Sequence, residues 1–218
     1  MAAPVPFDPL IFTDDYLRVR AVPTCHTSTF VWCHSAADKG ADWQFIVDPL
    51  RKLGHCNHIA FIFPYLDYSA PNDPAIRAKN EALVQKIVDE EIVKGCHPDR
   101  VAVGGYNEGL AVALLATLAD PKNTINGVLG ITERLALPSL AGVRKDANAQ
   151  TPVFVVDRSG ADGNEGKKAL EAAGHPVRAV VDGSKNASSG ANPVTQEELE
   201  KLDTFIHEVL PVEFAKKE

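Results

Sequence analysis

The sequence lacks the features of several protein classes. No apolar run approaches the about 18–20 residues that a membrane-spanning helix needs. The net charge of −7 and the pI near 5.5 leave no basic excess for binding nucleic acid or anionic lipid, so we expect neither as a partner. The first residues have neither the basic start of a signal peptide nor the Arg-rich character of a transit peptide. We therefore expect a cytoplasmic protein without membrane insertion, which could belong to a cytoskeletal or organellar assembly.

Cysteine is scarce, and its pattern argues against a disulfide framework or a metal site. The chain has four cysteines and no Cys-x-x-C pair, but each cysteine has a histidine beside it, at Cys25-His26, Cys33-His34, His55-Cys56 and Cys96-His97. Adjacent residues on a strand point to opposite faces, so such a doublet is poorly placed to give one ion two ligands. We expect reduced, buried thiols, no metal and no cofactor.

What the chain does contain is an alternation of strand-like and helix-like segments. Strands are predicted at 17–22, 28–34, 57–64, from 101 onward, and at 125–131, 152–156 and 177–181. Helices are predicted at 43–53, at 73–94 with Ile76, Leu83, Ile87 and Ile92 on its buried face, after Gly109, and from 193 to about 210. This alternation predicts one α/β domain over residues 13–218, with a doubly wound, mainly parallel sheet and helices on both faces.

Residues 1–12 contain three prolines and are predicted to form an extended arm. Free chain ends stay disordered unless something holds them. We therefore expect the arm to dock, either on the same chain or, as we favour, on other protein chains of an assembly.

The stretch that begins at Val101 carries the spacing Gly105-x-Asn107-x-Gly109 between a predicted strand and a predicted helix. In an α/β-hydrolase, Gly-x-Ser-x-Gly at such a junction holds the nucleophile on a sharp turn with positive φ. Asn tolerates positive φ better than most residues. We therefore interpret Asn107 as a residue that relieves strain at this turn.

Ligand sites in doubly wound sheets lie beyond the carboxyl ends of the strands. His34, Asn107, Asp157 and Asp162 each follow or end a predicted strand. We expect these four residues to gather at one edge of the sheet.

Five segments in the same order resemble the phospholipase/carboxylesterase family of α/β-hydrolases, which includes the acyl-protein thioesterases. The segments are 30–38 with Trp43 after it, Phe63-Pro64, 100–109, 127–131, and the last helix with Glu197-Glu-Leu199 and Phe205-Ile206. The resemblance spans residues 27–211. It implies the α/β-hydrolase fold and, in the family, ester or thioester hydrolysis by Ser, His and Asp.

The family's catalytic positions carry other residues here. The serine position is Asn107, whose amide is a poor nucleophile, and the acid falls at or near Asp162. Residues 176–206 contain no histidine. The vestigial histidine position is therefore one of Asn186, Ala187 and Asn192, of which we select Asn192.

The turn that would bind the oxyanion survives as a remnant formed by Ser35, Ala36 and Glu108. Ser35 replaces the family's glycine, and its Cβ would narrow the approach of a substrate to the backbone. The segment 65–73 is also shorter than the family's loop, which helps to line the acyl channel.

These losses lead us to expect no catalytic residue. We interpret the chain as a pseudoenzyme, a catalytically inactive hydrolase-fold protein that serves as a structural or interaction subunit of a larger assembly. The alternative is a residual or altered carboxylic-ester or thioester hydrolase, with Cys33 or Ser35 beside His34, or Ser159 near Asp162, as candidate groups. A further alternative is a protein that binds an acyl ligand without turning it over.

Overall fold

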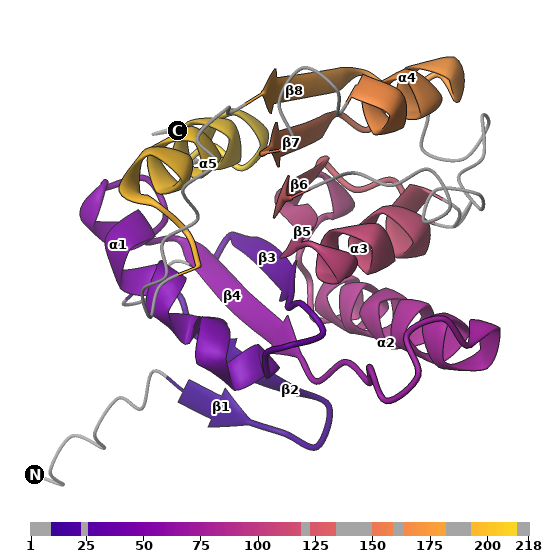
Figure 1. Cartoon of the computed structure of the whole chain (residues 1–218). Helices are drawn as coiled ribbons and strands as arrows, with labels where there is room; N and C mark the ends of the chain where they lie inside the picture. Colours follow the sequence, from indigo (N-terminus) through magenta and orange to yellow (C-terminus); the bar gives the residue numbers. More distant parts are fainter. Residues whose placement is uncertain are drawn as a thin grey trace, which may run out of the picture.

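The structure is a computed structural model that describes residues 10–22, 26–118, 123–133, 150–158, 164–181 and 193–212. Its centre is an eight-stranded sheet in the order β1-β2-β4-β3-β5-β6-β7-β8. Strands β3 to β8 pair in parallel, and β1 and β2 add an antiparallel edge beside β4. The predicted doubly wound, mainly parallel sheet is confirmed (Figure 1).

The strands are short and mostly buried. Their bounds are β1 Leu10–Phe12, β2 Tyr16–Val19, β3 Ser28–Cys33, β4 Ile59–Pro64, β5 Val101–Tyr106, β6 Gly127–Thr132, β7 Val153–Asp157 and β8 Val177–Val181. Every residue of β3 to β7 is buried. This burial explains their continuous apolar sequences, because parallel strands covered on both faces need no alternation of apolar and polar residues.

Helices cover both faces of the sheet (Figure 1). One face carries α1 (Val47–Lys52) and α5 (Gln196–Val209), together with the 3₁₀ helix Gly40–Ile46. The other face carries α2 (Pro74–Val93), α3 (Glu108–Leu118) and α4 (Asn164–Ala172). A second 3₁₀ turn, Pro98–Arg100, leads into β5. Among the described residues, no helix is both long and apolar enough to cross a membrane.

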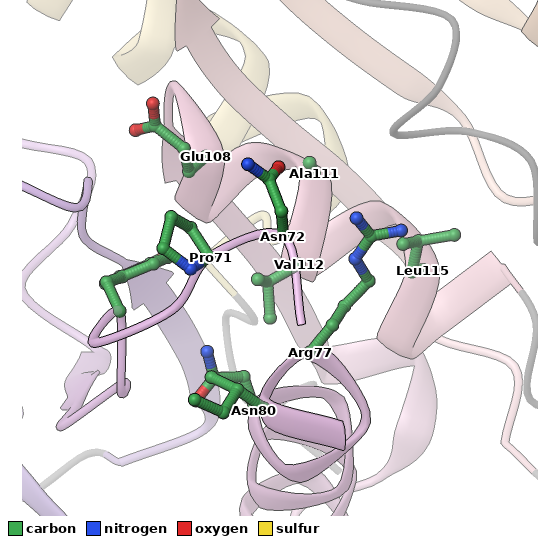
Figure 2. Close-up of a pocket in the computed structure, with 10 residues that line it drawn as sticks. Pro71, Asn72, Arg77, Asn80, Glu108, Ala111, Val112 and Leu115 are labelled. Carbon is green, nitrogen blue, oxygen red and sulfur yellow. The ribbon is translucent and has the colours of Figure 1, made fainter. Parts of the chain in front are cut away.

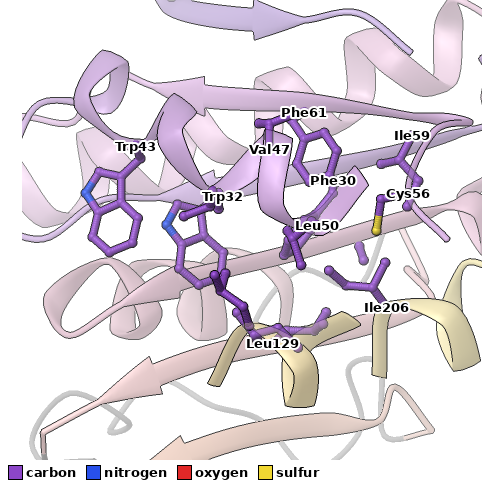
Figure 3. Close-up of a cluster of buried hydrophobic side chains, with 14 of the residues drawn as sticks. Phe30, Trp32, Trp43, Val47, Leu50, Cys56, Ile59, Phe61, Leu129 and Ile206 are labelled. Carbon is purple, nitrogen blue, oxygen red and sulfur yellow. The ribbon is translucent and has the colours of Figure 1, made fainter. Parts of the chain in front are cut away.

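Aromatic side chains fill the core beneath α1 and α5. Trp32 of β3 lies 5.5 Å from Trp43, and Phe30 packs edge-on against Phe61 of β4 with their ring centroids 5.9 Å apart (Figure 3). All four rings are almost completely buried. Burying an aromatic ring of this size stabilises the fold by about 1.5–3 kcal/mol relative to leaving it exposed.

Three predicted elements differ from those observed. The helix predicted at 43–53 is a 3₁₀ helix followed by the short α1. The strand predicted at 17–22 is β2, which ends at Val19. Helix α2 buries Val84 and Val88 beside Ile87, whereas Ile76, Leu83 and Ile92 are only half-buried. The buried face of α2 is rotated from the predicted one because the helix packs against α3 as well as against the sheet.

The predicted arm lies only partly within the described residues. Leu10–Phe12 pair with β2 as an antiparallel edge strand, so the domain begins before residue 13. Residues 1–9 lie outside the described part of the chain. Docking of the arm onto a partner stays a prediction.

Candidate functional site

The junction between β5 and α3 is a sharp turn at Asn107, whose φ is +49°. Two glycines make this turn possible. A Cβ on Gly105 would meet the backbone of Gly109, and a Cβ on Gly109 would overlap the carbonyl oxygens of Cys33 and His34 on the neighbouring strand. The predicted strand–turn–helix geometry with positive φ at Asn107 is therefore present.

The side chain of Asn107 is hydrogen-bonded to the backbone just after β6. Its Oδ1 accepts a hydrogen bond from the backbone N–H of Glu133 at 2.9 Å, and its own backbone N–H donates to Ile131 at 3.0 Å. In the part of the chain that the structure describes, its amide NH₂ has no acceptor. This side chain can therefore donate to a ligand at the turn.

The turn after β3 brings a carboxylate to the same place. The backbone N–H of Ala36 donates to Oε2 of Glu108 at 3.3 Å. Ser35 Oγ donates to the Asp38 carboxylate at 3.0 Å, and the same carboxylate accepts from the indole N–H of Trp43 at 3.2 Å. Glu108 thus bridges from the first turn of α3 to the turn after β3.

Both ring nitrogens of His34 form hydrogen bonds with the backbone. Its Nδ1 donates to the carbonyl oxygen of Ser35 at 2.7 Å, and its Nε2 accepts from the N–H of Leu66 at 3.2 Å. The backbone N–H of Leu66 can only donate, so Nε2 must be the unprotonated nitrogen. His34 is therefore the neutral tautomer that carries its proton on Nδ1. Burial lowers the pKa of His34 below its usual value, against the hydrogen bond to Ser35, which raises it.

The candidate nucleophiles beside His34 do not form a pair with it. Cys33 is fully buried, and this burial raises the pKa of its thiol, which disfavours the reactive thiolate. The hydroxyl of Ser35 faces Asp38 and not the imidazole. The other candidates, Ser159 and Asp162, lie outside the described residues, as do Asn186, Ala187 and Asn192.

Behind the turn lies a buried charge cluster centred on Arg158, which directly follows β7. Its guanidinium donates twice to Glu198 of α5, at 2.6 and 2.7 Å, and also to Tyr106 Oη and Glu133. Burial alone would lower the pKa of Arg158, but the hydrogen bonds to both glutamates raise it overall. This cluster fixes α5 against the carboxyl ends of the strands.

A cavity of about 120 Å³ opens beside Glu108, between α2, α3 and the segment that joins β4 to α2 (Figure 2). Its apolar lining comes mainly from Ile76 of α2 and from Ala111, Val112 and Leu115 of α3. Its polar lining comes from Glu108, Arg77, Tyr68 and two asparagines, Asn72 and Asn80. The cavity offers space for a small ligand group within reach of the turn.

The sequence predicted part of this arrangement. His34, Asn107 and Asp157 do lie at the carboxyl ends of the parallel strands β3, β5 and β7, and Asp162 lies outside the described residues. Sequence reasoning missed the Arg158 cluster and the bridge made by Glu108. The spacing Thr195-x-x-Glu198, a capping box at the start of α5, was a usable signal for the anchor of that cluster.

No metal site is found in the described segments, where no group of three or more His, Cys, Asp or Glu side chains could hold an ion. Residues 23–25, which include Cys25, lie outside these segments.

Comparisons with known proteins give a consistent result. The phospholipase/carboxylesterase family matches residues 63–159. Acyl-protein thioesterase 1 of Emericella nidulans is 25% identical over 229 residues, which cover 86% of this chain and 92% of that protein. The Gibberella zeae protein of the same name is 29% identical over 160 residues, which cover 60% and 68%.

Solved structures share the fold. Esterase PE8 has a TM-score of 0.67 at 18% identity and covers 88% of this chain and 97% of its own. Arabidopsis thaliana SOBER1 has a TM-score of 0.61 at 19% identity and covers 84% and 99%. The eight-stranded, mainly parallel sheet with helices on both faces is therefore the α/β-hydrolase fold.

These comparisons correct the interpretation of the chain as an inactive structural or interaction subunit. The relatives are named as thioesterases, and structural neighbours are named as esterases. These names point to hydrolysis, so the prediction that the chain is not an enzyme is wrong. The altered hydrolase is the better supported of the interpretations.

Proposed function

We propose that the chain, which matches the phospholipase/carboxylesterase family over residues 63–159 and is similar to acyl-protein thioesterases, hydrolyses carboxylic esters or thioesters by activating water instead of a serine. The family relation supports the reaction class. The mechanism rests on the position of the Glu108 carboxylate. Its Oε2 lies 3.3 Å from the backbone nitrogen of Ala36, beside the cavity. A base and backbone donors therefore meet where the family places its nucleophile.

Glu108 acts as the general base. Its carboxylate takes a proton from a bound water while the water oxygen adds to the carbonyl carbon of the substrate. The tetrahedral intermediate then collapses, the bond to the leaving oxygen or sulfur breaks, and protonated Glu108 returns the proton to the leaving group. The carboxylate is regenerated, and no covalent enzyme intermediate forms.

Three donors stabilise the oxyanion in this scheme. When substrate binds, the Ala36 N–H no longer donates to the Glu108 carboxylate and donates to the carbonyl oxygen of the substrate instead. In the first turn of α3, the N–H groups of Leu110 and Ala111 donate to the Asn107 carbonyl oxygen, whereas those of Glu108 and Gly109 precede any acceptor in the helix, and the helix dipole adds positive potential at that end. The amide NH₂ of Asn107, which has no acceptor among the described residues, gives a side-chain donor, and donors of this kind contribute about 3–4 kcal/mol to transition-state stabilisation in other hydrolases.

The test compares hydrolysis of p-nitrophenyl butanoate and of a butanoyl thioester with a buffer blank. We expect turnover by the wild-type chain and a loss of about 100-fold or more in kcat/KM for Glu108→Gln, because the amide can still accept from Ala36 but cannot take a proton. The matched control is Glu90→Gln on the outer face of α2, where Glu90 lies near Lys86 and Lys94.

The two parts of the proposal fail separately. Turnover of neither ester class by the wild-type chain would overturn the hydrolase assignment. Turnover that Glu108→Gln leaves unchanged would keep the assignment and overturn the role of Glu108. A stable acyl-enzyme found by mass spectrometry would overturn the water mechanism.

A further inference from the structure

The cavity beside Glu108 has a cation among its lining residues. Glu108 lies at one end, and Figure 2 shows Arg77 reaching from α2 toward α3, whose Ala111 and Leu115 line the same cavity. Between these two charges the lining from α3 is apolar. The cavity therefore has an acidic end at the reacting centre, an apolar middle and a basic wall.

Arg77 differs from the other cations of α2. Lys79 pairs with Asp67 at 3.6 Å, and Lys86 pairs with Asp15 at 2.6 Å. Arg77 makes no ion pair within the described residues. Burial raises the pKa of Glu81, one turn further along the helix, and the charge of Arg77 acts against this rise, but the two side chains form no salt bridge. The half-buried guanidinium thus keeps its hydrogen-bonding capacity for a ligand.

We propose that the acyl group bound here is short and ends in a carboxylate, as in a succinyl or glutaryl hemiester or thioester. This inference rests on the proposed hydrolase function and names its substrate class. Arg77 binds the distal carboxylate, since its planar fork matches a carboxylate with two parallel hydrogen bonds. The reacting carbonyl then lies at the Glu108 end.

The size of the cavity supports a short chain. A cavity of about 150 Å³ holds one benzene molecule, or about six carbon atoms. The cavity here measures about 120 Å³, which leaves room for two or three methylene groups and a carboxylate. The methylenes contact Val112 and Leu115 and keep the substrate's carboxylate apart from that of Glu108. A long fatty acyl chain exceeds this space.

The kinetic test compares monomethyl glutarate with methyl pentanoate, which has a similar chain without the distal charge. Methanol release is followed by NMR. We expect kcat/KM for the charged ester to exceed that for the neutral ester by about tenfold or more, and Arg77→Gln to remove this preference. Lys79→Gln is the matched control because it removes the same charge from the same helix outside the cavity, and it should keep the preference.

A binding measurement separates this inference from the proposed function. The probe is the monomethyl amide of glutarate, which resembles the substrate but is not an ester, titrated by ligand-detected NMR. Binding that Arg77→Gln abolishes and Lys79→Gln preserves supports the anionic pocket even if no ester is hydrolysed. Equal kcat/KM for charged and neutral esters, or a preference that survives Arg77→Gln, overturns the pocket and leaves the hydrolase assignment intact.

Discussion

Asn107 is the single non-glycine residue with positive φ among the described residues. Most side chains adopt this region at a cost of about 1–3 kcal/mol, and Asn adopts it more readily than Ser. The carbonyl oxygen of its side chain also accepts from Glu133 N–H, an interaction that a shorter serine does not reproduce. Both effects favour Asn at this turn. The residue thus combines backbone tolerance with the proposed role as an oxyanion donor.

The strain account makes a stability prediction. Asn107→Ser should lower the free energy of unfolding by about 1 kcal/mol, because serine has less tolerance of positive φ and loses the bond to Glu133. Thermal unfolding measures the change. Asn72→Ser, at an exposed position without positive φ, should leave the Tm nearly unchanged. An unchanged or higher Tm for Asn107→Ser would refute strain relief.

At the scale of elements, α5 is fixed by its first turn. The capping box of Thr195 and Glu198 satisfies the free N–H groups of the helix start, and the same Glu198 carboxylate forms the buried pair with Arg158. Burial raises the pKa of Glu198, but the hydrogen bonds from Arg158 and from the Thr195 N–H outweigh it, so the pKa lies below its usual 4.5. The helix start and the site therefore share one carboxylate.

This shared carboxylate predicts a pH dependence. Glu198→Gln should lower the free energy of unfolding by about 3 kcal/mol at pH 7, since it breaks a buried ion pair. A depressed folded-state pKa gives stability above the unfolded pKa that disappears as the pH falls through the folded value. The difference between wild type and variant should therefore shrink below about pH 4.5.

Denaturant unfolding at several pH values measures this effect. The control is Glu197→Gln, because the neighbouring carboxylate is 71% exposed and pairs with Lys201 on the helix surface. It should change stability by no more than about 0.5 kcal/mol at any pH. A penalty for Glu198→Gln that stays constant from pH 7 to pH 3 would argue against the pair as its source.

At the scale of the whole molecule, one buried arginine joins distant parts of the chain. Arg100 donates to the carbonyl and hydroxyl of Thr27, just before β3, and to the carbonyl of Pro211, just after α5, at 2.7 Å. His58 adds a bond to Leu210 at 2.9 Å. The amino ends of the central strands and the end of α5 are therefore tied at one point, opposite the candidate site.

Arg100→Ala should lower the free energy of unfolding by about 2–3 kcal/mol, because buried carbonyl groups lose a charged donor. Urea unfolding measures the loss. Arg178→Ala is the control, since Arg178 pairs with Glu208 at the surface and should change stability by less than about 0.5 kcal/mol. Equal effects for both variants would show that Arg100 does not act as a tie.

The sequence by itself determined the sheet and the turn, and it carried the resemblance to the phospholipase/carboxylesterase family. Strand positions and the spacing Gly105-x-Asn107-x-Gly109 follow from local patterns of apolar residues and glycine, which neighbouring residues express without the rest of the chain. Helix α2 was placed correctly, but its buried stripe was not, because that stripe depends on packing against α3. Local pattern decides that an element exists, and packing decides which face it buries.

Only the tertiary structure decided what the site contains. The bond between Glu108 and Ala36 joins residues 72 apart, and the Arg158–Glu198 pair joins residues 40 apart. The cavity lined by Arg77 exists because α2 and α3 lie side by side. Such contacts depend on how the elements pack and leave no local signal. For this reason the missing serine and histidine suggested lost chemistry, whereas the fold assembles a different set of groups at the same turn.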